Sequence, residues 1–278
     1  MNRLDPWLSR WGALVLVAAA FLAAPSAASA RLVIKSEFIP SDPPPNLIGG
    51  GNLVEIFNTA VATWEKAFPG GQPWVLDLKY EWAPLQGQNA RFILKEQGGH
   101  PHRILSGLIQ FNNTGSPPFF ADSTPDDHSE FTEYHEQFAD TPEGMINVGR
   151  MFSGATGDAA LGVDLLTIAA HEIGHGLGLA VGNPASEHMI VVTPPRPFRG
   201  LVIFAFGDHL AISTALMGQL LTGEGVRILI SSLDVLAEAQ ISRFNHPNLD
   251  PYAVVPPRTN RQPAPGGRSR GRARRAAR

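Results

Sequence analysis

The chain has 278 residues, 44% of them hydrophobic, and no cysteine. This length fits one domain with appendages, and the apolar content is enough for a sizeable core. Without cysteine the chain has no disulfide, no cysteine-based zinc site, no thiol nucleophile and no lipoprotein anchor. The net charge of −3 conceals a split: residues 31–255 hold 24 acidic and 12 basic residues, and the eight charged residues beyond 255 are all arginine.

The first thirty residues predict a cleaved secretory signal peptide. Arg3 and Arg10 precede the apolar run 12–24, and Ala28-Ser29-Ala30 forms a small-x-small cleavage site. The alternative is an N-terminal membrane anchor, but the run is shorter than the roughly 18–20 residues needed to span a bilayer. We therefore expect a secreted protein, extracellular or periplasmic, with no transmembrane segment after cleavage.

Apolar periodicity predicts an α/β domain over residues 31–255. The predicted strands are 31–40, 74–83, 103–111 and 145–152. The predicted helices are 53–68, 163–179 and 230–241, the last with Ser231 as N-cap and Asp234 three residues on. Residues 119–144 are acidic and rich in turn formers, and we expect loops there.

The helix over 163–179 carries a possible metal motif. Leu166, Ala170, Ile173 and Leu177 form its buried stripe, and His171 and His175 lie on another face. Histidines at i and i+4 lie one turn apart, so both imidazoles reach one tetrahedral metal. In the sequence His-Glu-x-x-His, Glu172 follows the first histidine and reaches water at the metal without ligating it.

From His171 to Gly178 the sequence resembles the metzincin zinc proteases, especially the matrixin-like ones. Their pattern is H-E-x-x-H-x-x-G-x-x-H followed by a Met-turn. His171, Glu172, His175 and Gly178 match it. Gly178 is expected to end the helix with a positive φ. The third histidine is missing, because Val181 stands at its position.

A displaced third ligand is predicted from the Met-turn. Met217 follows in the sequence Ala-Leu-Met, and His209 precedes it by the interval that matrixin-like sequences use. On this interpretation residues 179–208 are an insertion, an arrangement that resembles that of the leishmanolysin-like metzincins. Met217 would form the floor beneath the metal without binding it. The competing third ligand is His188, which has no methionine at that interval.

The resemblance implies a metzincin-like fold and a zinc-dependent endopeptidase, with Glu172 as general base. A twisted, mixed and mostly parallel sheet would accompany an active-site helix and a C-terminal helix behind the site. Residues 145–152 would be the edge strand above the cleft, and 53–68 the first long helix. Two family features are absent: a cysteine switch, and a tyrosine closely following Met217.

Two other interpretations of the metal motif remain open. A gluzincin-like site would take a carboxylate third ligand, for example Glu187 or Glu224, and a non-catalytic secreted binding protein would keep zinc for stability. The remaining candidates for a structural zinc or calcium site are His100, His102, Asp126, Asp127, His128 and His135. A solvated acidic loop is the simpler interpretation of the residues around Asp126.

The tail 256–278 consists mostly of proline, glycine, arginine and alanine, and it predicts disorder. Its arginines suit an anionic surface, such as polyanionic glycan, lipid headgroups or nucleic acid. A solvated tail without a partner is the alternative. We expect a monomer that acts on protein or peptide substrates and has no specific nucleic-acid partner.

Overall fold

The computed structural model describes residues 30–252 apart from 185, 187–188 and 220–222. The fold is mixed α/β, as predicted at that level. Its helices are α1 (Leu53–Ala67), the 3-10 helix η1 (Gly157–Leu161), α2 (Leu165–Leu177) and α3 (Ser232–Ile241). The longer strands are β1 (Ala30–Phe38), β2 (Gln72–Ala83), β3 (Ala90–Gly98), β4 (Arg103–Asn112), β6 (Phe131–Thr141), β7 (Gly144–Ala155) and β10 (Val202–Phe206). The short strands are β5 (Phe119–Phe120), β8 (Val163–Asp164), β9 (Met189–Val191), β11 (His209–Leu210) and β12 (Arg227–Leu229).

Two predicted segments fall outside this range: the signal peptide up to residue 29, and the tail 256–278. None of the described helices has the length and apolar character that a membrane crossing requires.

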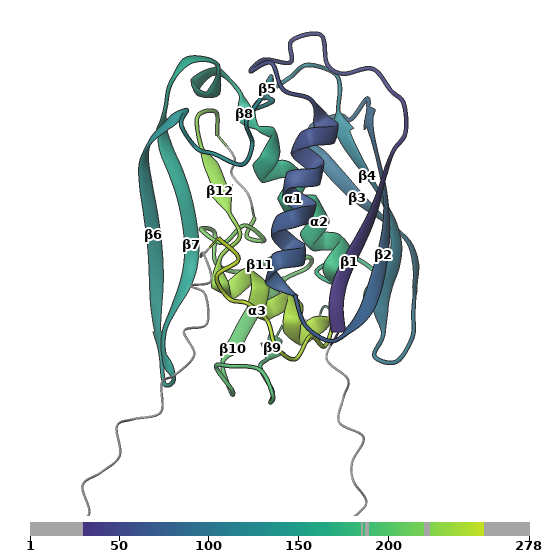
Figure 1. The fold of residues 1–278 in the computed structure, drawn as a ribbon, viewed down its shortest axis with the longest axis vertical. Coiled ribbons are helices and arrows are strands. Elements are labelled where there is room, and N and C mark those ends of the chain that lie inside the picture. The colour runs from purple at the N-terminus through teal and green to yellow at the C-terminus, as the bar shows by residue number, and fades with distance from the viewer. Residues whose placement is uncertain (1–29, 185, 187–188, 220–222, 253–278) are drawn as a thin grey trace, which may run out of the picture.

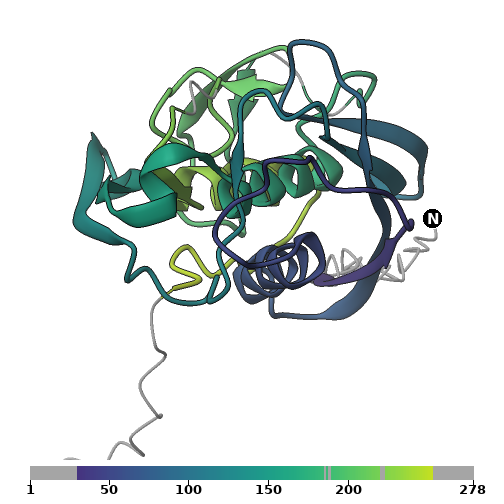
Figure 2. The same ribbon diagram turned by 90° about the horizontal axis from the view of Figure 1, so that it is seen from above.

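The main sheet has the strand order β1-β2-β4-β3. Strands β1, β2 and β4 run parallel, and β3 pairs antiparallel with β4 at the edge. The sheet is therefore mixed and mostly parallel, as predicted. Helices α1 and α2 lie side by side against one face of it (Figure 1; Figure 2).

Helix α1 confirms the predicted helix over 53–68. The Asn52 side chain accepts a hydrogen bond from the Glu55 amide and caps the N-terminus. Ile56, Ala60 and Trp64 recur at helical spacing on the buried face. The indole Nε1 of Trp64 donates a 2.8 Å hydrogen bond to the Ala170 carbonyl oxygen, so α1 is fastened directly to α2.

Helix α2 is buried on all sides. The predicted apolar stripe packs in the main core, and the opposite face is covered too, because β12 and the segment around Met217 lie against it. The polar residues Thr167, His171 and Glu172 are buried as well.

A second sheet has the order β12-β7-β6. Strand β7 lies in its middle, so the prediction that residues 145–152 form the edge strand of the cleft is wrong. Residues 119–144 were expected to form loops, but they contain strand β6, so this prediction is also wrong. Most β6 side chains are exposed, so the strand lacks the buried alternation by which strands are recognised in a sequence.

The segment predicted as an insertion, 179–208, contains β9 and β10, which form a third sheet with β11. Ile190, Ile203, Ala205 and Leu210 point inward from it. They pack in a second core cluster with residues of α3 such as Leu236. Helix α3 begins as predicted, with Ser231 and Asp234 forming a capping box.

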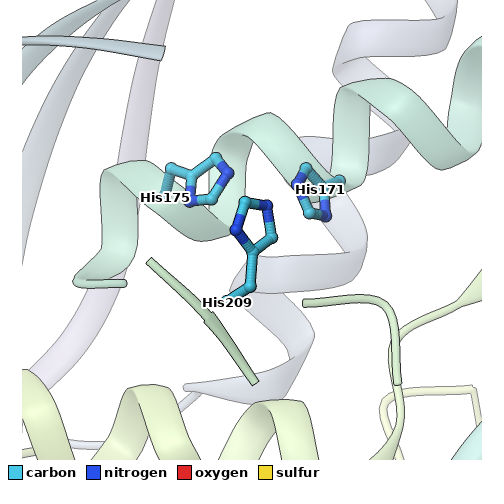
Figure 3. A group of neighbouring side chains, drawn as sticks. All are labelled: His171, His175 and His209. Atoms are coloured by element: carbon cyan, nitrogen blue, oxygen red, sulfur yellow. The ribbon is translucent and has the colours of Figure 1, made fainter. Parts of the chain in front are cut away.

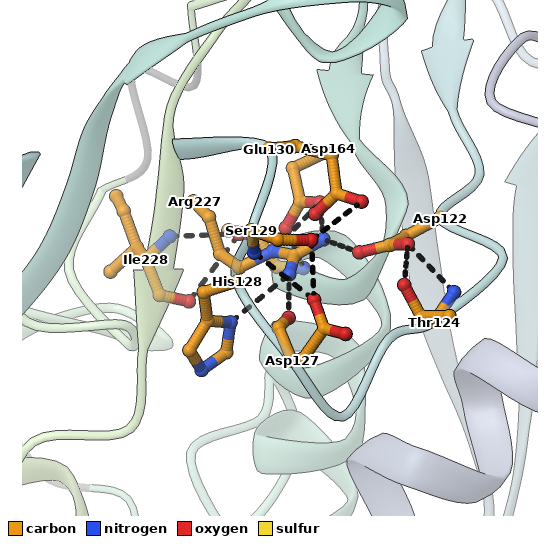
Figure 4. Close-up of polar contacts among 10 residues, drawn as sticks. Asp122, Thr124, Asp127, His128, Ser129, Glu130, Asp164, Arg227 and Ile228 are labelled. Carbon is orange, nitrogen blue, oxygen red and sulfur yellow. Dashed lines mark hydrogen bonds and ion pairs between the residues drawn. The ribbon is translucent and has the colours of Figure 1, made fainter. Parts of the chain in front are cut away.

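A buried arginine connects strand β12 to the start of α2 and to the loop 121–130 (Figure 4). Arg227 of β12 has no exposed surface, and its guanidinium donates to Asp164 at 2.9 Å and to Asp122 at 2.7 Å. It also donates to the Asp127 carbonyl oxygen and to Nδ1 of His128. Asp164 is in turn the N-cap of α2, accepting from the Thr167 amide and hydroxyl. The network therefore fixes where α2 begins.

Two of the residues predicted as candidates for calcium or structural zinc, Asp127 and His128, contribute to this network. Of the six named, none belongs to a group of three possible metal ligands within the described ranges. The structure gives those six residues no joint site.

Candidate metal centre

Three histidines converge on one point: His171 and His175 from α2, and His209 from the start of β11 (Figure 3). Each offers one ring nitrogen, and these nitrogens all lie within 4.8 Å of one another. The ring centroids are 4.6 to 5.2 Å apart. The predicted third ligand thus lies beside the helical pair, although 38 positions separate it from His171 in the sequence.

Each imidazole is held through its Nδ1 atom. His171 Nδ1 lies 2.7 Å from the Leu216 carbonyl oxygen, and His175 Nδ1 contacts the Leu179 carbonyl oxygen. His209 Nδ1 lies 2.8 Å from the Asp208 carboxylate. These oxygens only accept hydrogen bonds, so Nδ1 carries the proton and Nε2 keeps its lone pair. Metal-binding histidines are oriented in this way.

Burial keeps the two helical histidines neutral. It lowers the pKa of His171 well below its usual range, an effect that the neighbouring His175 reinforces. Burial lowers the pKa of His175 to about 4. Both rings are therefore deprotonated at neutral pH, the form that ligates a metal.

Glu172 lies beside the three histidines in the same cleft. Its Oε2 atom is buried and accepts no hydrogen bond. Burial and the nearby charge of Asp208 raise the pKa of Glu172 to about 8. A buried carboxyl group without a partner is costly to a fold, so its presence indicates a use beyond packing.

Asp208 is a site residue that the sequence did not reveal. It follows Gly207 in the two-residue turn between β10 and β11. Its hydrogen bond with His209 lowers the pKa of Asp208 to about 2, so it remains ionised. Adjacent residues do not ordinarily face each other, so sequence spacing gave no reason to pair it with His209.

Met217 lies directly beneath α2, where the sequence predicts the floor of the site. It is fully buried, and its sulfur occupies the space that a Cβ atom on Gly174 would need. The main chain here is held by Asp234 of α3, which accepts hydrogen bonds from the Leu216 and Met217 amides at 3.0 and 2.8 Å. The Leu216 carbonyl oxygen that orients His171 is thereby fixed.

Gly178 ends α2, as predicted, with a φ of 159°. Space matters more than φ here, because a Cβ atom would lie 2.6 Å from Ile241 and 2.9 Å from a carboxyl oxygen of Glu238. The chain therefore turns close against α3. This turn brings the Leu179 carbonyl oxygen to His175.

The cleft over the histidines has a volume of about 720 Å³. Its far wall is β3 and the preceding loop, including Ala90, Arg91 and Phe92. The sequence predicted residues 145–152 as the strand at this wall, which is wrong. Strand β3 was not predicted, because register shifts and partial burial interrupt its apolar alternation. In the described sheet β3 pairs only with β4, and its other edge faces the cleft.

The chain matches no protein-family model, no curated protein and no solved structure.

Among the other predicted ligands, only Glu224 falls within the described residues. His188 and Glu187 lie outside the described residues. Glu224 is exposed and is not part of the three-histidine group. Val181, at the family position of the third histidine, lines the cleft with 77% of its surface exposed.

Proposed function

We propose that this protein is a secreted zinc-dependent endopeptidase of the metzincin type. The observation that carries the proposal is the joint arrangement of four side chains: three imidazoles fixed through Nδ1, and an unpartnered buried carboxyl group, all lining one cleft. Three protein ligands with a neighbouring acid are the set that catalytic zinc sites use.

The donor set fits zinc. His171, His175 and His209 would bind through Nε2, and three neutral imidazoles suit a borderline cation better than calcium or magnesium. When bound, zinc supplies a Lewis acid that polarises the scissile carbonyl and makes water a stronger nucleophile near neutral pH.

Glu172 is the proposed general base. Its carboxylate would accept a proton from the attacking water and later return it to the leaving amine nitrogen. A dication nearby stabilises the ionised carboxylate, so its raised pKa falls when the site is loaded. A carboxylate with a pKa near the working pH can both accept the proton from water and donate it to the leaving amine.

The substrate would be an extended polypeptide. The free edge of β3 faces the cleft, and a peptide pairs with such an edge through main-chain hydrogen bonds. This mode of binding recognises a backbone rather than a particular side chain, which suits an endopeptidase.

Two details favour the metzincin type over the gluzincin-like alternative. His209 supplies the third ligand position, whereas Glu224 lies outside it. Met217 packs beneath the helix between the two histidine turns, against Gly174. Secretion stays part of the proposal, supported by the signal-like sequence 1–30.

The test is hydrolysis of an unfolded protein by the purified chain, with and without a zinc chelator. Glu172→Ala should abolish cleavage while zinc still binds, and His209→Ala should lose both cleavage and zinc. Glu224→Ala is the matched control and should change neither. Unchanged zinc affinity in His209→Ala would refute the metzincin assignment. Zinc binding without cleavage of any substrate would favour the non-catalytic alternative.

A further inference from the structure

An uncharged row of exposed side chains lies on the outer face of the β9–β10 hairpin. We call this row, Met189 and Val191 of β9 with Val202, Phe204 and Phe206 of β10, the apolar row. Phe206 is 74% exposed, Phe204 58% and Met189 54%. The opposite face of the hairpin packs into the second core cluster. The fold thus uses one face and leaves an equally apolar face in solvent.

The row shares its face with the third histidine. Residues directly opposite in antiparallel strands point to the same side of a sheet. Met189 is paired with Phe204, and Phe206 is paired with His209. The side chains at positions 202, 204 and 206 therefore form a line that ends beside His209.

One hollow connects the row to the cleft. Phe206 and His209 together line a hollow of about 550 Å³, which also contacts Gln219. His209 and Gln219 line the main cleft as well. A chain lying in the cleft and leaving it past His209 would therefore next meet Phe206 and Phe204.

We propose that the apolar row binds apolar side chains of an extended substrate, several residues away from the bond that is cut. This inference rests on the proposed peptidase function and names its substrate class: polypeptide segments with clustered large apolar residues, as unfolded proteins expose. Large exposed apolar patches generally mark interaction sites, and aromatic side chains contribute strongly to such contacts.

Continuity with the cleft favours this occupant. His209 and Gln219 line both the cleft and the hollow beside Phe206, so an extended peptide would fill the cleft and cover the row together.

The experiment compares three fluorogenic peptides with the same cleavable core. One is the core alone, and the other two extend it on both sides, either with phenylalanine and leucine or with serine and glutamine. The zinc-loaded full chain should cleave the apolar peptide with a kcat/KM about tenfold above that of the polar one. Phe204→Ser combined with Phe206→Ser should remove this preference and leave kcat/KM for the core peptide within about twofold.

Phe138→Ser combined with Met145→Ser is the matched control. These side chains are 50% and 63% exposed on the β6–β7 hairpin, away from the cleft, and the control should keep the preference. No preference in the wild type, or its equal loss in both double variants, would overturn the inference while core cleavage still upheld the proposed function.

Failure of the proposed function has a different signature, namely that the wild type cleaves none of the three peptides. Vesicle co-sedimentation and sedimentation velocity complete the test. Suppose the Phe204 and Phe206 changes abolished binding to vesicles or self-association but left peptide preference intact. The row would then serve a membrane or a second copy, and the inference would be wrong.

Discussion

The sulfur of Met217 occupies the space that a side chain on Gly174 would need. A Cβ atom on Gly174 would clash with this sulfur and would lie 2.9 Å from the terminal methyl carbon of Met217. The helix that carries the histidines can therefore approach the turn below it only because its residue 174 has no side chain.

Gly174→Ala should destabilise the protein by about 1–3 kcal/mol, because overpacking a buried contact outweighs the gain in helix propensity. Chemical denaturation measures the effect. Gly176→Ala is the control in the same helix: its nearest contacts would be 3.4 Å away, and it should be neutral or slightly stabilising. Met217→Ala should reduce the cost of Gly174→Ala, and additivity of the two changes would contradict this packing relationship.

Asp208→Asn should weaken zinc binding about 10–100-fold, because a neutral amide orients His209 less firmly than a carboxylate does. Competition with a fluorescent zinc chelator measures the affinity. The fold should be unaffected, since Asp208 is a half-buried residue of a surface turn. Asp126→Asn, a change of the same charge at an exposed position, should bind zinc like the wild type. Equal affinities in all three proteins would remove Asp208 from the site.

Arg227→Met should cost about 3–5 kcal/mol of stability, because it leaves Asp122 and Asp164 buried without their cation. Denaturation by urea gives the value. Arg91→Met removes an arginine that is exposed and bonded to Gln110, and it should cost less than about 1 kcal/mol. Adding Asp164→Asn should restore part of the lost stability, because one of the two uncompensated charges is gone. A loss as small as that of Arg91→Met would show that the network is dispensable.

Glu238 predicts a loss of stability at alkaline pH. Burial raises the pKa of this carboxyl group well above its usual value, and the nearby Leu179 amide only partly opposes the rise. Neither carboxyl oxygen accepts a hydrogen bond of good geometry. The folded state therefore keeps a proton that the unfolded state releases above about pH 4.5, and stability falls as pH rises from there through the folded pKa.

Glu238→Gln should match the wild type at pH 4 and exceed its stability by at least about 1 kcal/mol at pH 8. Thermal unfolding in the presence of a chelator measures this without a contribution from bound metal. The exposed Glu224→Gln should follow the wild-type curve throughout. If the curve of Glu238→Gln also did so, the carboxyl group would be ionised in the folded protein.

The predictable parts of the site are those with a regular period or a fixed interval. His171 and His175 follow from helical geometry, and the interval to Met217 led to His209. Asp208 and β3 had no such signal. The Asp208 side chain contacts His209 only because of the two-residue turn between β10 and β11. Strand β3 is an edge strand whose apolar alternation is interrupted by register shifts. Strand β6 of the second sheet was missed for a related reason, since its mostly exposed side chains leave it without a buried face.

The dependence of the site on Asp234 sets an order of events during synthesis. All three histidines exist once residue 209 has been made, yet the main chain that orients His171 is anchored to α3, made later. Domains fold as their segments emerge, so an incomplete chain would carry every ligand in an unassembled state. Metal capture would then follow the docking of α3, and a chain interrupted before residue 234 would lack a formed site.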